Sequence, residues 1–302
     1  MDSLTYNFHI ACKNGEIEII KKLLNNRRLN INKQDYCGYT SFHYACLLGH
    51  FEIVELLIKK ANLKINSKNN DGMTGFHFAC KYGHLAIVDL LIKDARLEFN
   101  SKDIYGRTAF YYACLKGYHT IVEFLIKDSR LKINSQDSNG YTGFYVACIN
   151  EHLAIVDLLI KKSNLNINIK SNNDYTFFHL AYSVECFAVV ELLIKDARFE
   201  INNQNNYGWT PFHYICYHGN NKIISLFLNS NRKIDQNIQS THEHCGFPIG
   251  TKSYDILKNK NIKLDIVKEK ISKNQKLIFS AADGNLVELK ILLQRKKIRI
   301  TL

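Results

Sequence analysis

Residues 74–92 read TGFHFACKYGHLAIVDLLI, and this stretch decides the fold. Thr74 suits a helix N-cap, because its hydroxyl can accept from the free backbone N–H groups of the first turn. Gly83 ends that helix, since the residue after the last turn takes a left-handed conformation that favours a side chain without Cβ. The apolar residues from Ile87 to Ile92 then follow at helical spacing. The stretch therefore predicts two short antiparallel helices.

The same pattern recurs along the chain with a period of 34 residues. Asp71-Gly72 adds turn chemistry ahead of Thr74, and we expect this part of each repeat to form a projecting, hairpin-like finger. The repeated threonines are Thr40, Thr74, Thr108, Thr142, Thr176 and Thr210, and the asparagines that close the repeats are Asn66, Asn100, Asn134, Asn168 and Asn202. Such self-similarity marks a stacked array of repeats.

We expect one array of about eight repeats over residues 1–302. An N-terminal cap repeat, residues 1–32, precedes the regular ones. A degenerate repeat at 237–272, after a lengthened finger, and a C-terminal repeat at 273–302 follow them. The regular repeats are residues 33–66, 67–100, 101–134, 135–168, 169–202 and 203–236. The expected fold class is all-α, a solenoid of helix-turn-helix repeats with short β-hairpin-like fingers.

The repeats carry the marks of a known family. Thr210-Pro211-Phe212-His213 resembles the T-P-L-H signature of ankyrin repeats, and Gly83–Leu91 resembles their G-H-x-x-I-V-x-L-L block. The period is that of tetratricopeptide repeats, but their Trp-Leu-Gly-Tyr pattern and closing Pro are absent. Ankyrin repeats usually have a period of about 33 residues, one fewer than here. We expect the extra residue in the turn at Asp94–Asn100. The long turn and the many Asn, Lys and Ile residues resemble ankyrin proteins of giant amoeba-infecting viruses and some amoebae.

Two neighbouring repeats depart from the pattern. Glu151 and Glu185 stand where other repeats end the first helix with Gly, and Asp174 replaces a finger Gly. A residue with a Cβ held at positive φ costs on the order of 1 kcal/mol. We therefore expect the array to open first around residues 150–190.

Composition restricts the class of protein. Hydrophobic residues make up 46% of the chain, as in folded soluble proteins. No apolar run approaches the ~20 residues that span a membrane, and the N-terminus lacks the pattern of a secretory signal. Nine cysteines, an odd number, argue against a secreted disulfide framework. These features predict an intracellular, cytoplasmic protein, in the host cytoplasm if the source is a virus.

Candidate catalytic and metal-binding residues fall on structural positions. The cysteines at one repeat position are expected in the core, and the resemblance implies a structural hydrogen-bonding role for the repeated histidines. His242-Glu243-His244-Cys245 lacks a second ligand pair with zinc spacing. No enzyme activity, cofactor or metal is expected. The cysteines are Cys12, Cys46, Cys80, Cys114, Cys148 and Cys216, and the histidines are His43, His77, His179 and His213.

The resemblance implies that partners contact the concave face, formed by the fingers and the first helices. Tyrosine, tryptophan and arginine dominate interface energetics, although packing between adjacent fingers is an equal alternative for each finger tyrosine. The candidate partner-binding residues are Tyr36, Tyr39, Tyr82, Tyr105, Arg107, Tyr141, Tyr175, Tyr207, Trp209 and Tyr217.

The function expected is that of a monomeric, non-enzymatic scaffold or adaptor that binds another protein. The net charge of +12 favours acidic partners, although lysines at helix ends also serve solubility. Arg295-Lys296-Lys297 with Arg299 is the best local basic patch for phosphate or acidic peptides. A basic nucleic-acid-binding module and a ubiquitin-ligase substrate adaptor remain alternatives, but the residues favour neither nucleic acid nor membrane as partner.

Overall fold

The computed structural model describes residues 2–180 and 187–218, and beyond them residues 223, 226–227, 230, 235, 238–242 and 250. Within these residues the regular structure is helical, and β structure is limited to isolated bridge residues, among them the antiparallel pair Gln136 and Thr142. The all-α class is thus confirmed. The helices are α1 (Ser3–Asn14), α2 (Ile17–Leu23), α3 (Ser41–Leu48), α4 (Phe51–Ile58), α5 (Gly75–Tyr82), α6 (Leu85–Ile92), α7 (Ala109–Lys116), α8 (His119–Leu125), α9 (Gly143–Ile149), α10 (Leu153–Ile160), α11 (Phe177–Leu180), α12 (Phe187–Ile194) and α13 (Pro211–His218).

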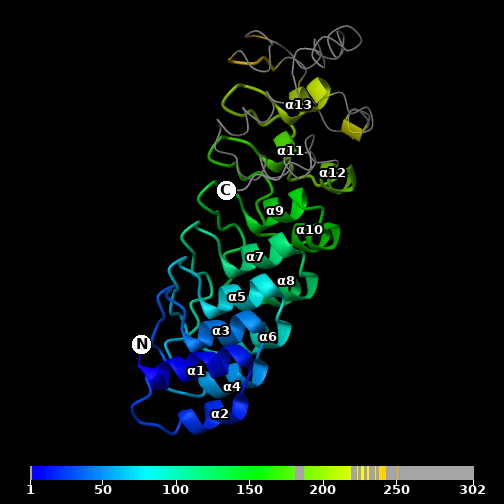
Figure 1. Ribbon diagram of the computed structural model, residues 1–302. Helices are drawn as coiled ribbons and strands as arrows, with labels where there is room; N and C mark the ends of the chain where they lie inside the picture. The colour runs from blue at the N-terminus through cyan, green and yellow to red at the C-terminus, as the bar shows by residue number, and fades with distance from the viewer. Residues whose placement is uncertain are drawn as a thin grey trace. The chain divides into compact units, whose positions relative to one another are not determined.

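The chain divides into two compact units, Met1–Ser138 with Thr142–Leu159, and Asn139–Tyr141 with Ile160–Leu302. In the first unit α1, α3, α5, α7 and α9 stack in one layer, and α2, α4, α6 and α8 stack in a second (Figure 1). The first helices α1, α3, α5 and α7 also pack on the second helix of their own repeat. In the second unit α11 packs against α13. The expected repeats at 237–272 and 273–302 lie outside the described residues, except for 238–242 and 250.

Helix α5 shows why the first helices begin where they do. The Thr74 hydroxyl accepts from the backbone N–H of His77, and Nδ1 of His77 accepts in return from the backbone N–H of Thr74 over 3.1 Å. This reciprocal capping satisfies two backbone donors that the helix leaves free. Gly83 ends the helix at φ 82°, as the sequence predicted.

A ring from the next repeat covers the glycine at the end of the first helix. His84 Nε2 donates to the Leu47 carbonyl over 2.9 Å, and a Cβ at Gly49 would lie 2.6 Å from this imidazole. His50 and His152 make the equivalent bond to the preceding repeat, at the carbonyls of Lys13 and Leu115. Glycine is therefore favoured at this position, both for its positive φ and for the space that the ring occupies.

The core lies between the two helix layers and repeats along the array. In α6, Ile87, Val88 and Leu91 are buried, whereas Leu90 is half-buried. The cysteine column is buried too, as predicted, and burial raises the pKa of the Cys12 thiol to about 12. These cysteines behave as small apolar core residues.

The turn after the second helix is held by an arginine. Arg96 forms a bidentate ion pair with Asp94, in which the shortest N–O distance is 2.6 Å. The guanidinium also donates to the Ile58 carbonyl at the end of α4, over 2.8 Å. Arg130 repeats both contacts with Asp128 and the Ile92 carbonyl. A cation placed on the last carbonyls of a helix stabilises its negative end.

The closing asparagines join consecutive repeats. Asn66 donates to the Arg96 carbonyl over 2.7 Å and accepts from the Glu98 backbone N–H over 2.9 Å. We call the set of asparagines with this pair of bonds the asparagine ladder: Asn32, Asn66, Asn100 and Asn168. Each rung binds the backbone of the following repeat and none of its side chains.

Two residues other than glycine take positive φ within the described residues, Glu151 at 59° and Asp174 at 63°. These are two of the positions where the sequence departs from the repeat pattern, so the strain expected there is present. Glu185, the third such position, lies outside the described residues.

Candidate functional site

Each finger turns around one short polar side chain. In the finger before α7, Asp103 Oδ1 accepts from the backbone N–H groups of Tyr105 and Arg107 over 2.9 and 2.8 Å. Such turns fix the finger backbone, because one side chain satisfies two donors that the turn would otherwise expose. The same bonds form at Asp35, Asn69 and Asn205.

The remaining carboxylate oxygen ties the finger to its helix. Tyr112 donates its hydroxyl to Asp103 Oδ2 over 2.6 Å, and Tyr44 donates to Asp35 in the same way. Burial and the carboxylate raise the pKa of Tyr112 above its usual value, so the hydroxyl stays protonated at neutral pH. The finger is thus presented as a rigid element.

The repeated histidines bind backbone near the fingers, as expected. Nδ1 of His77 receives the Thr74 backbone N–H, so Nε2 carries the proton that it donates to the Arg107 carbonyl over 3.1 Å. Burial lowers the pKa of His43 and His77 to about 4. A neutral, doubly bonded imidazole has no free nitrogen for proton transfer. This geometry indicates a structural role.

The candidate partner-binding residues divide by exposure. Tyr36, Tyr82 and Tyr105 are exposed, with 94%, 47% and 52% of their surface accessible. Tyr39, Arg107 and Tyr207 are half-buried, and Tyr39 stacks on Tyr44 with ring centroids 5.2 Å apart. The remaining four, Tyr141, Tyr175, Trp209 and Tyr217, are buried. Finger tyrosines therefore include both contact candidates and packing residues.

Trp209 corrects one expectation. Its finger position made it a candidate partner-binding residue, but its side chain is fully buried, with ring centroids 4.8 Å from Tyr214 and 5.9 Å from Tyr217. The residue before each capping threonine packs onto the first helix. A sequence signal exists, because a large side chain stands there in every regular repeat: Tyr39, Met73, Arg107, Tyr141, Tyr175 and Trp209.

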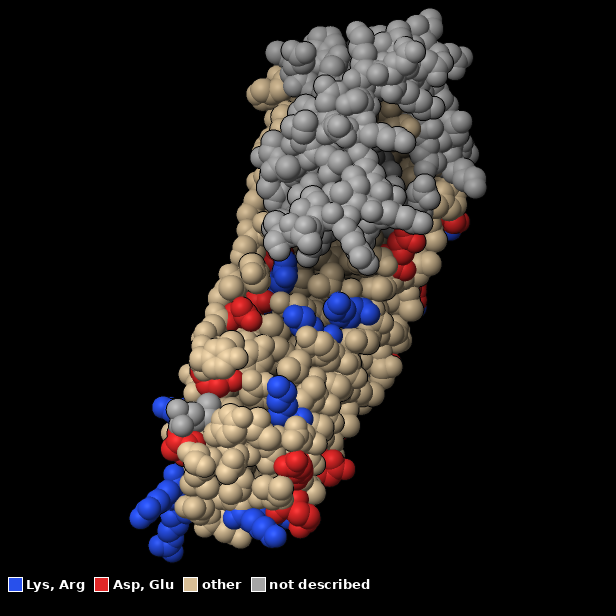
Figure 2. All heavy atoms as spheres, viewed as in Figure 1, with Lys and Arg blue, Asp and Glu red and all other residues tan. Residues whose placement is uncertain are grey.

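Several exposed apolar side chains of the first unit lie on the fingers and at the ends of the first helices, although Ile19 and Leu153 are exposed on second helices. We call this surface the finger–helix face and define it by the exposed residues Tyr36, Leu48, Tyr82, Ile104 and Tyr105. Figure 2 shows basic side chains over the stacked first helices of this unit, with the visible acidic side chains nearer its margins. The face combines aromatic, aliphatic and cationic groups.

Models of known protein families match most of the chain. The model "Ankyrin repeats (3 copies)" matches residues 61–137 and 129–205, "Ankyrin repeats (many copies)" matches residues 8–58, and "Ankyrin repeat" matches residues 207–238. The chain belongs to the ankyrin-repeat proteins. Ankyrin repeats are generally protein–protein interaction modules, and proteins built from them are generally non-enzymatic. No match was found among curated proteins.

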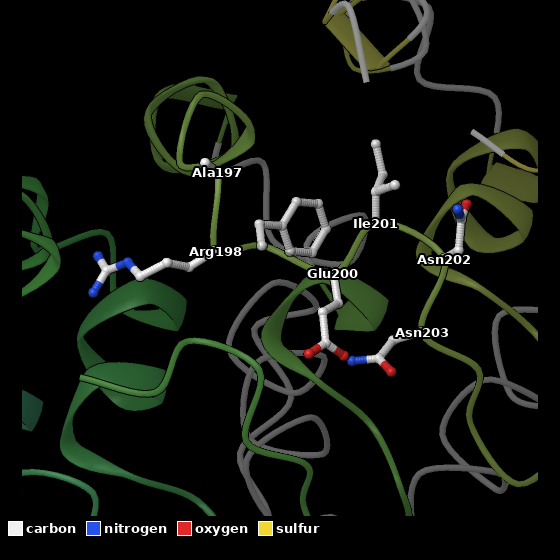
Figure 3. A pocket seen from close by; sticks show the side chains of 7 residues that line it. Ala197, Arg198, Glu200, Ile201, Asn202 and Asn203 are labelled. Atoms are coloured by element: carbon white, nitrogen blue, oxygen red, sulfur yellow. The ribbon is translucent and has the colours of Figure 1, made fainter. Parts of the chain in front are cut away.

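In the second unit, a cavity of about 600 Å³ lies near α12. All of its lining residues, Ala197–Asn203, come from the turn that follows this helix (Figure 3). Arg198 is already engaged, because it pairs with Asp196 and donates to the Lys162 carbonyl over 2.9 Å. The lining therefore presents no acid–base pair poised for chemistry.

The part of the ankyrin array that the structure describes contains no group of three or more His, Cys, Asp or Glu side chains placed to hold a metal ion. Of the predicted His242–Cys245 cluster, only His242 is described. No helix among the described residues is long and apolar enough to cross a membrane. The basic cluster at Arg295–Arg299 lies outside the described residues.

Proposed function

We propose that this ankyrin protein is a non-enzymatic scaffold or adaptor that binds a partner protein through the finger–helix face. The observation that carries the proposal is the exposure of Tyr82, Ile104 and Tyr105 on a backbone that internal hydrogen bonds hold in place. Exposed aromatic groups supply most of the binding energy in protein interfaces. A rigid backbone adds to this, because little ordering entropy is lost on binding.

Two candidates, the half-buried Tyr39 and the buried Trp209, pack on first helices and serve the framework. Tyr39 and Trp209 hold fingers against first helices, so their replacement would disturb the framework as well as any interface. Tests of binding therefore belong on the exposed residues, where a substitution leaves the packing intact.

The experiment compares two variants after a partner has been captured on the immobilised protein, identified by mass spectrometry and purified. Tyr82→Ala combined with Tyr105→Ala should weaken partner affinity by at least about thirtyfold, since losing an interface anchor costs ~2 kcal/mol. Leu153→Ala is the matched control, because Leu153 is an exposed apolar residue on a second helix.

Circular dichroism confirms that both variants remain folded. Equal affinity of the double variant and the control would show that the partner binds elsewhere, and the proposal would then be wrong.

A further inference from the structure

Three lysines just after second helices of the first unit have acidic partners. Lys59, Lys93 and Lys127 each pair with a carboxylate one turn earlier, at N–O distances of 3.3, 2.7 and 3.0 Å. All three are exposed, so the pairs contribute little to stability. They do neutralise the charge that this side of the array presents.

Cations at the finger–helix face lack such partners. Lys81 and Lys116, at the end of the first helices α5 and α7, form no ion pair among the described residues. Lys81 Nζ lies 5.2 Å from the ring centroid of Tyr112 and 5.8 Å from that of Tyr82. Partial burial, and then the charge of Lys116, lower the pKa of Lys81 below its usual value.

Arg107 brings a third cation to the same place. It occupies the finger position that the other regular repeats fill with Tyr, Met or Trp. Its Cζ lies 5.0 Å from the ring centroid of Tyr105, and its Nε is inaccessible and without a hydrogen-bond partner among the described residues. The nearest carboxylate oxygen, Asp137 Oδ2, is 3.8 Å away and already accepts from Tyr111.

The acidic groups nearby compensate this positive charge only in part. Asp103 and Asp71 favour the charged form of Lys81, but the effects of partial burial and of Lys116 are larger. Asp103 is also occupied, since it accepts from two backbone N–H groups and from the hydroxyl of Tyr112. An anionic ligand would thus find two lysines without an ion pair among the described residues, and a guanidinium whose contact with Asp137 is long, at 3.8 Å.

The cluster is local: Lys13 in α1 occupies the position of Lys81 two repeats earlier, but the repeats on either side of Lys81 carry no cation there. The position of Lys81 is occupied by Leu47 and Leu115 in the adjacent repeats, and that of Lys116 by Tyr82 and Asn150. A nucleic acid carries regularly spaced phosphates and is bound by cations that track its backbone. A local cluster bordered by aliphatic and aromatic side chains fits a peptide that mixes acidic and apolar residues.

We propose that Lys81, Arg107 and Lys116 form a binding site for an acidic peptide segment, whose carboxylates meet the three cations while its apolar side chains contact Tyr82, Ile104 and Tyr105. The inference rests on the proposed function and adds the chemistry of the partner. Arg107 supplies directional donors for a carboxylate, and the two lysines act as point charges.

The test uses replacements that the array itself carries at equivalent positions, so that the fold is preserved. Lys81→Leu copies Leu47, Arg107→Met copies Met73, and Lys116→Asn copies Asn150. The control, which removes the same charge from the second helices, is Lys59→Gln with Lys93→Gln and Lys127→Gln. Circular dichroism and thermal unfolding establish that both triple variants of the full chain are folded.

Fluorescence anisotropy measures binding of a labelled peptide of alternating Glu and Leu, its Gln-for-Glu counterpart, and a single-stranded oligonucleotide of equal charge. We expect the Glu peptide to bind, and the cluster variant to lose about tenfold or more in affinity, or ~1.4 kcal/mol. The control should lose less than about twofold. No binding of the Glu peptide, equal losses in both variants, equal binding of the Gln peptide, or tighter binding of the oligonucleotide would each overturn the proposal.

The captured partner separates the two proposals. The cluster variant carries Lys81→Leu, Arg107→Met and Lys116→Asn. If Tyr82→Ala with Tyr105→Ala abolishes binding of the partner while the cluster variant binds normally, the partner uses the face, and the proposal of an acidic segment is wrong. If neither variant affects the captured partner, both proposals fail. Loss in both variants supports both.

Discussion

Tyr112 donates its hydroxyl to Asp103 Oδ2 over 2.6 Å, and both residues are buried. One repeat earlier the equivalent pair is Phe78 and Asn69, so the hydroxyl and the carboxylate are absent together. The Tyr112–Asp103 bond has a physical reason, because a buried carboxylate without a donor bears its desolvation cost without compensation. An amide facing an apolar ring avoids this cost.

The pairing predicts a rescue. Tyr112→Phe should lower the free energy of unfolding by about 1–3 kcal/mol, because one oxygen of buried Asp103 loses its partner. Adding Asp103→Asn copies the Phe78–Asn69 pair and should recover part of that loss. Urea denaturation of the single variants and the double variant gives the coupling energy. Strictly additive losses would show that the hydroxyl does not support the carboxylate.

The second-helix core gives a test of register. Leu91 is fully buried and Leu90 is half-buried, so Leu91→Ala should cost ~2–5 kcal/mol and Leu90→Ala clearly less. Thermal and urea unfolding measure both losses. Costs below a few tenths of a kcal/mol for both variants would mean that the helix faces have been assigned to the wrong sides.

The buried histidines predict a loss of stability in mild acid. His43 and His77 have a pKa of about 4 in the folded protein, below the value of 6.5 expected when they are exposed. Their neutral form is favoured by folding, so their contribution is complete above pH 6.5 and is lost as the pH falls towards 4. Between those values each histidine should remove about 1.4 kcal/mol per pH unit.

Urea unfolding at a series of pH values checks the slope. Replacing His77 by Tyr, the residue that the array carries at Tyr111, should reduce the slope by up to one proton. An unchanged slope in the His77→Tyr variant would rule out this histidine as a source of the acid sensitivity.

The positive φ angles at Glu151 and Asp174 locate a weak region. Backbone amides around residues 150–190 should exchange with solvent faster than those around 75–125, because stability in an array is a sum of local terms. Glu151→Gly should slow that exchange by relieving about 1 kcal/mol of strain. Hydrogen exchange followed by mass spectrometry measures both effects. Equal protection of the two regions would contradict the expectation.

Much of the fold could be read from the sequence, because its determinants are residue types at fixed positions. The capping threonines, the helix-ending glycines and the buried cysteines all lie where the period of 34 residues places them. The strain at Glu151 was likewise visible as a missing glycine. Each of these features depends on the residue type at one position of the repeat, so it can be predicted from the sequence alone.

The binding face was harder to predict, because exposure depends on packing between elements. Tyr36 and Trp209 are both finger aromatics, yet one is 94% exposed and the other is fully buried. The residues before the capping threonines differ in type and have only a large side chain in common. A comparison of residue types does not reveal that they share a packing position. The separation of paired from unpaired lysines was visible in advance, since Glu55 and Lys59 stand four residues apart on one helix face.

The asparagine ladder has a consequence for how such a chain can change over generations. Asn66 and its counterparts bond to a carbonyl and an N–H that every residue type except proline provides. Because the asparagine bonds only to backbone groups, this connection does not depend on the side chains of the neighbouring repeat. Units can therefore be copied, deleted or exchanged without a matching change next door. Lineages that carry this joint are free to lengthen the array and to vary each unit independently.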